Sequence, residues 1–292
     1  MGSSMLGRTR QAITTAVRNR VNGPDFATGT PLWTVPGDRW FTPADAIWRV
    51  HRDPAMFIGG IRSLLLQSLH PVAMQAVSEH SGQGSDPWGR LQRANQFVNT
   101  TTYGTVAEAE QAIAKVHHVH GFVQGVTPEG EPYEAGDPHL LKWVHIVDVE
   151  SFLLAHQAYG ERPLTPERCD EYVAQTAVVA EQLGVIDPPR TRAELETQLM
   201  SYRLELRRTE AAVEAAELLL RRPPLPKSSR PAYRMLVHGA LALTPPWALA
   251  RLRVPYYPVR ELMAPPIARA ACRTLRWAFA VDPVHTPPPA RD

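Results

Sequence analysis

A cluster of histidines in one amphipathic segment is the first feature of this chain that could do chemistry. The segment runs from residue 108 to residue 123 and contains His117, His118 and His120. At 100° per residue its aliphatic side chains form a single stripe, and His120 falls inside that stripe. We therefore expect a helix whose His120 side chain points into the core. Its two nitrogens must then be satisfied by a hydrogen bond or by ligating a metal, and the pattern alone favours the hydrogen bond.

Two arginines form a second candidate, in a helix expected to begin near Pro87. Arg90 and Arg93 are i, i+3 neighbours and therefore share one face of that helix. The apolar residues near them, such as Phe97, favour partial burial of at least one guanidinium, which would then require an anion. A solvated pair or an internal salt bridge explains the same pattern equally well.

Two further histidines lie in apolar surroundings. His145 belongs to a segment that Asp137-Pro138 should start as a helix and that should run to about Tyr159. His70 ends an earlier segment that is apolar around most of its circumference, and Pro71 follows it. The chain thus offers inward-facing histidines on separate helices.

The rest of the pattern predicts an all-α fold, a single large helical domain. Most segments carry helical periodicity and start signals, and residues 126–133 are the one credible place for a short β ribbon. We expect an N-terminal arm over residues 1–40, the main domain over residues 41–282 and a disordered tail over residues 283–292.

The composition limits the classes of binding partner and the compartment that we expect. With 31 basic and 29 acidic residues the formal charge is +2, which does not favour nucleic acid as a partner and favours a small molecule. The two cysteines, Cys169 and Cys272, are far apart and form no zinc-type spacing, so a disulfide scaffold is not expected. No signal-like segment and no transmembrane run is present, from which we expect a cytoplasmic protein.

Motifs of the commonest enzyme classes are absent. The sequence has no GxGxxG after a strand, no GxxxxGK[ST], no GxSxG and no HExxH. What remains is a helical interior with histidines and arginines, which is the composition of a haem pocket or of an ordinary helical core.

Four segments, in this order, resemble the MpaB-type oxygenase family, which includes the catalytic domain of latex clearing protein, the rubber oxygenase. They are residues 60–73, 86–93, 116–120 and 137–145. The ordered set is more specific than any one segment, and the resemblance extends over about residues 40 to 270. It implies an all-helical fold with a globin-like core that carries one b-type haem.

The resemblance also implies roles for single residues. His120 matches the histidine that ligates the haem iron, and Arg90 matches an arginine beside the haem. Arg93 occupies a position that is also basic in the rubber oxygenase, so both arginines are candidates for catalysis and for haem binding. The next residue departs from the family pattern, because Ala94 stands where the rubber oxygenase has a threonine.

His145 and His70 lie in the matching segments without a secure counterpart in the rubber oxygenase. We carry His145 as a catalytic candidate and His70 as a haem-binding candidate. For each, a buried histidine bonded to a backbone carbonyl is the structural alternative.

The implied activity is a haem-dependent oxygenase that uses dioxygen and acts on a small hydrophobic substrate, of isoprenoid or lipid type, by oxidative cleavage or oxygenation. Five apolar residues would line its pocket: Leu65, Leu69, Phe97, Val116 and Val147. Two alternatives stay open. One is a haem-binding sensor or carrier without turnover, in which His145 or His70 closes the sixth iron position, and the other is a metal-free helical interaction protein.

Overall fold

The computed structural model describes residues 31–80, 87–255 and 257–280, together with Gly7, Arg10, Thr14 and Pro288. These residues are mostly helical, as predicted. Most of the predicted arm and, apart from Pro288, all of the predicted tail lie outside the described residues. None of the described helices combines the length and apolarity needed to cross a membrane.

The first half of the chain forms short helices and one hairpin: η2 (Leu32–Thr34), α2 (Ala46–His51), α3 (Ala55–Gln67), α4 (Pro71–His80), α5 (Pro87–Tyr103), α6 (Val106–His120), β1 (Gln124–Val126) and β2 (Pro132–Glu134). The second half begins with the long helix α7 (Pro138–Tyr159) and continues with α8 (Pro166–Gln182), α9 (Arg192–Ser201), η3 (Tyr202–Leu204), α10 (Glu210–Leu220), η4 (Lys227–Ser229), α11 (Arg230–Leu243), α12 (Pro246–Arg251) and α13 (Pro258–Phe279).

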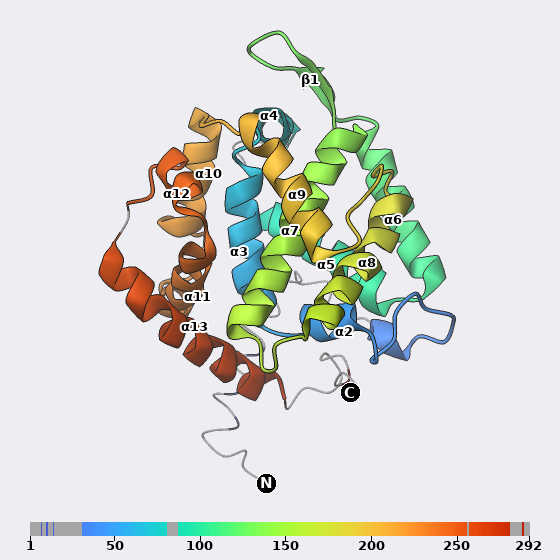
Figure 1. Cartoon of the computed structure of the whole chain (residues 1–292), viewed down its shortest axis with the longest axis vertical. Helices are drawn as coiled ribbons and strands as arrows, with labels where there is room; N and C mark the ends of the chain where they lie inside the picture. Colours follow the sequence, from blue (N-terminus) through green and yellow to red (C-terminus); the bar gives the residue numbers. More distant parts are fainter. Residues whose placement is uncertain are drawn as a thin grey trace.

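Helices α3 and α7 lie side by side in the middle of the molecule (Figure 1). On one side, α11 packs against α3 and carries α13 on its outer face, and on the other side α2 packs against α8. Fully buried side chains from both central helices, among them Leu65, Trp143 and Ile146, fill the space between these layers. The core therefore forms around the α3–α7 pair.

Helix starts follow local rules that the sequence displays. The hydroxyl of Thr105 accepts a hydrogen bond from the backbone N–H of Glu108, and the carboxylate of Glu108 accepts one from the backbone N–H of Thr105. These two bonds form the capping box that a threonine followed three residues later by a glutamate predicts. Asp137, Thr165 and Thr191 likewise cap the helices that follow them.

Thr42-Pro43 has the same pattern as Thr165-Pro166, a hydroxyl residue followed by proline, and so predicts a helix start. That prediction is wrong, because α2 begins at Ala46 with Asp45 as its N-cap. The backbone N–H of Thr42 donates to Asp45 Oδ2 at 2.6 Å, so Thr42 belongs to the turn before the helix. A threonine followed by proline is compatible with a helix N-cap and with a turn before a helix. Here the carboxylate of Asp45 selects the turn.

The predicted β ribbon is confirmed. Strands β1 and β2 pair antiparallel, with Gln124 opposite Glu134 and Val126 opposite Pro132. The hairpin projects from the top of the molecule between α6 and α7 (Figure 1). The phenol of Tyr133 donates a hydrogen bond to Glu79 of α4, which joins the hairpin to the helical body.

Gly59 allows the close approach of α3 and α7. A Cβ at this position would lie 2.9 Å from the backbone oxygen of Ser151 and 3.0 Å from Cα of Phe152, so no side chain fits there. At Gly60 a Cβ would meet only a terminal carbon of Leu91, at the ordinary contact distance of 3.5 Å. Two adjacent glycines in one helix therefore have different roles.

We predict that Gly59→Ala destabilises the protein by about 2 kcal/mol, because the new methyl group overlaps the backbone of α7. Gly60→Ala is the matched control and should stabilise by up to about 1 kcal/mol, since it removes a flexible residue from a helix interior. Urea denaturation followed by circular dichroism measures both. Equal effects of the two substitutions would contradict the assigned contact.

Candidate functional site

Polar side chains connect the two central helices inside the core. Asp148 of α7 accepts a hydrogen bond from Ser63 Oγ and another from Gln67 Nε2, the latter at 2.8 Å. The same Gln67 amide nitrogen lies 2.8 Å from Ser63 Oγ. Two residues of α3 thus donate to one oxygen of the Asp148 carboxylate, Oδ1.

The buried guanidinium of the described residues is that of Arg62, which the sequence analysis missed. Arg62 and Glu150 form an ion pair in which Nη1 and Nη2 donate to the two carboxylate oxygens, Nη2 at 3.1 Å. Nη1 also donates to Ser151 Oγ at 2.6 Å, and Nε donates to the backbone oxygen of Leu243 at 2.9 Å. With its donors satisfied, a side chain exposed by only 2% keeps its charge inside the core.

The arginines predicted from the sequence lie elsewhere. Both belong to α5, but Arg93 is exposed, so it is not the buried guanidinium that its apolar neighbours suggested. The side chain of Arg90 is outside the described part of the structure. Helix α5 packs mainly on α6 and α2, and Arg93, Ala94 and Gln96 are exposed among its described side chains. Apolar spacing alone does not reveal which residues of a helix its neighbours cover.

His145 has a buried nitrogen without a hydrogen-bond partner among the described residues. Its Nε2 atom is inaccessible to solvent, and its acidic neighbours on α7, Asp148 and Glu150, are occupied by α3. Burial lowers the pKa of His145 to about 4, and the nearby charge of Lys142 acts in the same direction. The side chain is therefore a neutral imidazole at pH 7, with a nitrogen available to a ligand.

His120 is half-buried at the last residue of α6, so the prediction that it points into the core is wrong. Helix α6 lies at the edge of the molecule (Figure 1), where it packs mainly on α5. Of its predicted apolar stripe Ile113 is buried, whereas Val119, next to His120, is 49% exposed. Periodicity identifies the more apolar face of a helix, but it does not show how far along the helix that face is covered.

Another interior histidine, His51, was not predicted. His51, at the end of α2, lies with Nδ1 2.8 Å from Thr102 Oγ1 and with Nε2 3.2 Å from the phenol oxygen of Tyr172. Burial, assisted by His156, lowers its pKa to about 3. The sequence signal was slight, since His51 follows Ile47 by one helical turn and so shares its buried face.

His70 is buried, but its partners differ from those of the other candidates. Its Nε2 lies 3.3 Å from Glu205 Oε2, and the Nε2 of His139 lies 2.8 Å from the same oxygen. His139 and Glu205 were not singled out from the sequence, because residues far apart along the chain carry no spacing signal. These three side chains could hold a metal ion.

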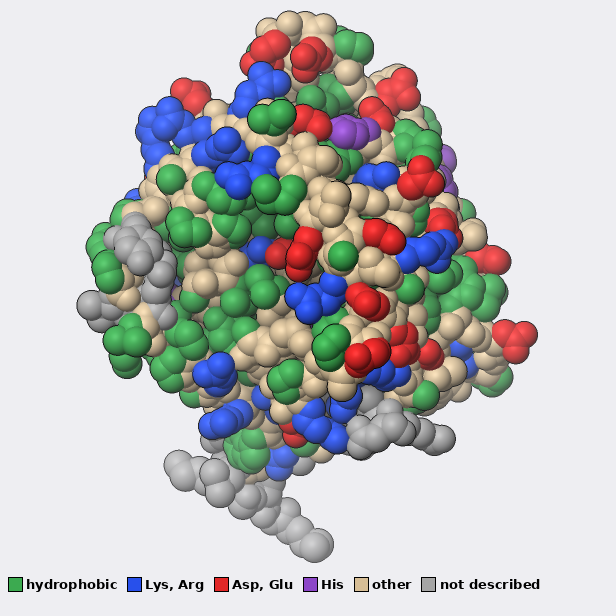
Figure 2. Space-filling model, in the orientation of Figure 1, with side chains coloured by type: hydrophobic (Ala, Val, Ile, Leu, Met, Phe, Trp, Pro, Cys, Tyr) green, Lys and Arg blue, Asp and Glu red, His purple; other side chains and the backbone are tan. Residues whose placement is uncertain are grey.

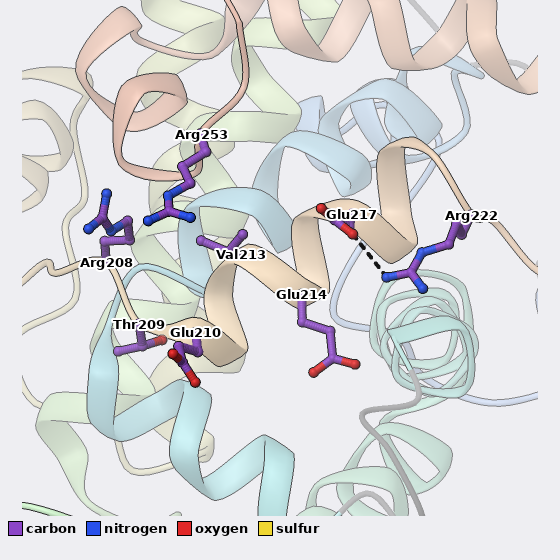
Figure 3. Close-up of a pocket in the computed structure, with 8 residues that line it drawn as sticks. All are labelled: Arg208, Thr209, Glu210, Val213, Glu214, Glu217, Arg222 and Arg253. Atoms are coloured by element: carbon purple, nitrogen blue, oxygen red, sulfur yellow. Dashed lines mark hydrogen bonds and ion pairs between the residues drawn. The ribbon is translucent and has the colours of Figure 1, made fainter.

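A surface groove of about 470 Å³ lies along α10. Figure 3 shows Arg208 and Arg253 at one end of it and the Glu217–Arg222 pair at the other, with Val213 between them. Charged side chains dominate this groove, which therefore does not suit an apolar molecule. The wider surface is also mixed, with acidic, basic and apolar side chains distributed over the face in Figure 2.

The comparison with protein families identifies the relationship. Residues 48–277 match the family described as ER-bound oxygenase mpaB/B'/Rubber oxygenase, catalytic domain. The chain belongs to this family. No curated protein and no solved structure matches the chain.

Membership in the MpaB/rubber oxygenase family confirms the predicted relationship and indicates an oxygenase, with dioxygen and a substrate as its reactants. The match runs from α2 into α13, so it includes all of the candidate residues named above. Of the predicted pocket residues, Leu65, Leu69 and Val147 are fully buried in the core. Phe97 on α5 and Val116 on α6 are half-buried.

We predict that Glu150→Gln costs about 3 kcal/mol of stability, because it leaves the Arg62 charge in the core without a counter-ion. The control is Glu196→Gln, which breaks a surface pair with Arg192 whose side chains are 66% and 48% exposed. That change should cost less than about 0.5 kcal/mol. Urea denaturation distinguishes the two cases, and a cost at Glu150 no larger than that at Glu196 would contradict the role of Arg62.

A second prediction concerns acid stability. The folded pKa of His51 lies below its unfolded value, so the unfolded state binds the proton first and stability falls as the pH drops from about 6.5 toward about 3. Between pH 7 and pH 5 His51 should account for about 2 kcal/mol of this loss. His51→Gln should therefore flatten the pH dependence of the unfolding free energy. His118→Gln, at an exposed position, should leave it unchanged, and equal slopes in both variants would refute the assignment.

Proposed function

We propose that this protein is a b-type haem-dependent oxygenase that acts on a small hydrophobic molecule. The observation that carries the proposal is the family match over residues 48–277. The substrate class is isoprenoid or lipid-like, and the reaction is oxidative cleavage or oxygenation. The globin-like core stays a prediction.

The interior chemistry fits a haem. A haem requires an apolar enclosure that carries little charge, and the unpartnered Nε2 of His145 belongs to a buried neutral imidazole. Half-buried apolar residues of α5 and α6, such as Phe97 and Val116, could contact the edge of a macrocycle. A buried nitrogen without a partner costs free energy in the free protein, and a ligand at that position would recover it.

Each candidate has a role in this proposal. His120, half-buried at the last residue of α6, would hold the iron. Arg93, being exposed, would suit one haem propionate, and Arg90 would bind the other propionate or stabilise negative charge on dioxygen. A bound haem would supply a redox-active iron for dioxygen chemistry.

The other residues act on the substrate. Apolar side chains exclude water and admit a hydrocarbon chain, since burying apolar surface favours such a ligand. The neutral His145 adds no charge to this environment and can accept a hydrogen bond or a proton at Nε2. In this proposal His70 does not bind the haem, because its contacts are with Glu205 and His139.

The free nitrogen of His145 also favours a second candidate function. If His120 and His145 both ligated the iron, no position would remain for dioxygen, and the protein would be a haem sensor or carrier without turnover. The two functions differ in one measurable property, the accessibility of the sixth iron position.

We expect the full-length protein, purified after expression with added haem precursor, to show a Soret band that shifts when carbon monoxide is added to the reduced form. Such a shift would establish an open iron position and the oxygenase. A haem spectrum that carbon monoxide does not change would favour the sensor or carrier. A colourless protein after reconstitution with haem would overturn both and leave a metal-free helical protein.

Substitutions identify the residue that ligates the haem iron. His120→Ala should abolish retention of haem on a desalting column, whereas His118→Ala, two residues away on the exposed face of α6, should retain it fully. His145→Ala should keep the haem but change its carbon monoxide spectrum or its turnover. Full retention with an unchanged spectrum in His120→Ala would refute the ligand assignment.

A further inference from the structure

Two imidazoles and a carboxylate converge at one end of α7. One ligand atom from each of His70, His139 and Glu205 lies within 4.8 Å of the other two. Both Nε2 atoms approach the same carboxylate oxygen, Glu205 Oε2, at 3.3 Å and 2.8 Å. The three residues come from three different elements: the turn before α4, the first turn of α7 and the segment after η3.

Neighbouring contacts hold these side chains in place. The ring of Tyr202 stacks on His139 with centroids 4.5 Å apart, and its hydroxyl donates to the backbone oxygen of His139 at 2.9 Å. His70 is buried beside the ring of Trp143. These rings fix both imidazoles before any ligand arrives, which lowers the entropic cost of binding.

The backbone fixes the carboxylate as well. The N–H of Arg207 donates to the backbone oxygen of Leu69 at 2.8 Å, which joins the segment carrying Glu205 to the residue before His70. The site thus has a fixed spacing even though its carboxylate comes from a region far along the chain.

A hydrogen bond at Nδ1 of His139 prepares the other ring nitrogen, Nε2, to act as a metal ligand. Its Nδ1 lies 3.2 Å from the hydroxyl oxygen of Tyr202, whose own proton is directed to the backbone oxygen of His139. A proton on Nδ1 would then point to Tyr202, which leaves the Nε2 lone pair facing the carboxylate of Glu205. Two electron-rich atoms 2.8 Å apart require a proton or a cation between them.

We propose that His70, His139 and Glu205 form a binding site for a first-row divalent transition metal ion, separate from the haem site. Two imidazoles with one carboxylate suit zinc or iron(II) and do not suit magnesium or calcium, which prefer oxygen ligands. The side chains of His139 and Glu205 are 53% and 41% exposed, so the remaining coordination positions open to solvent.

Metal binding would break one weak contact of His70, and one nearby positive charge would oppose it. The N–H of Ala73 lies 3.4 Å from Nδ1 of His70, and this weak contact is lost when Nε2 ligates and Nδ1 carries the proton. Arg207 also places a positive charge near His70, and that charge opposes a bound cation.

The test titrates Zn²⁺ into the full-length protein after chelator treatment, with isothermal calorimetry as the readout. We expect one ion per chain at this site and a rise of the unfolding temperature of about 4 °C when free Zn²⁺ is 100-fold above its Kd. Co²⁺ should give visible absorption bands that report imidazole and carboxylate ligands. Neither readout depends on haem.

Variants decide whether the ion binds here. His139→Ala and Glu205→Gln should each weaken Zn²⁺ binding at least tenfold, and circular dichroism establishes that both fold. His118→Ala, which removes an exposed histidine from a different cluster, should bind Zn²⁺ as the parent does. Equal affinity in His139→Ala, Glu205→Gln and the parent would overturn the site.

The Soret band of the same samples separates the two proposals. His139→Ala should lose Zn²⁺ binding and keep its haem, whereas His120→Ala should lose haem and keep its Zn²⁺ binding. A protein that never binds haem but shows the expected Zn²⁺ results would refute the proposed function and leave this site intact. Loss of haem in His139→Ala would refute the separation of the two sites.

Discussion

Buried polar contacts between α3 and α7 are the constraint on which the rest of the structure depends. Two apolar helices could pack in several registers at similar cost, but charged and polar groups inside a core must all find partners. Arg62 with Glu150, and Ser63 and Gln67 with Asp148, satisfy that requirement in one arrangement. The layers α11–α13 and α2–α8 then assemble around a pair whose position is already fixed.

The same contacts explain why Nε2 of His145 has no hydrogen-bond partner among the described residues. The acidic residues on α7 that could have accepted a hydrogen bond from this imidazole are directed to α3. A buried neutral nitrogen without a partner in this part of the chain is costly unless function requires it. Strained or unsatisfied groups of this kind are expected where a protein binds something.

Local features were predictable from the sequence and long-range ones were not. The capping box at Thr105 and the hairpin after α6 depend on a few adjacent residues, and both were found where expected. The family was recognisable because four segments occur in order. The burial of His120 was not predictable, because it depends on how much of α6 its neighbours cover. The partners of His70 lie far along the chain, so no window of sequence contains them.

Gly59 has a consequence for the kinds of sequence change that this fold can tolerate. Because Gly59 has no side chain, the backbone of α7 lies directly against α3 at this position. The residues that bind Asp148 and Glu150 follow Gly59 within the next turns of α3. Inserting one residue after Gly59 would rotate everything beyond it by about 100° and move Arg62 and Ser63 away from their carboxylates together. Substitutions that keep the length of α3 and spare these residues leave the alignment intact. The centre of the molecule can therefore diverge by exchange of residues but not by changes in length.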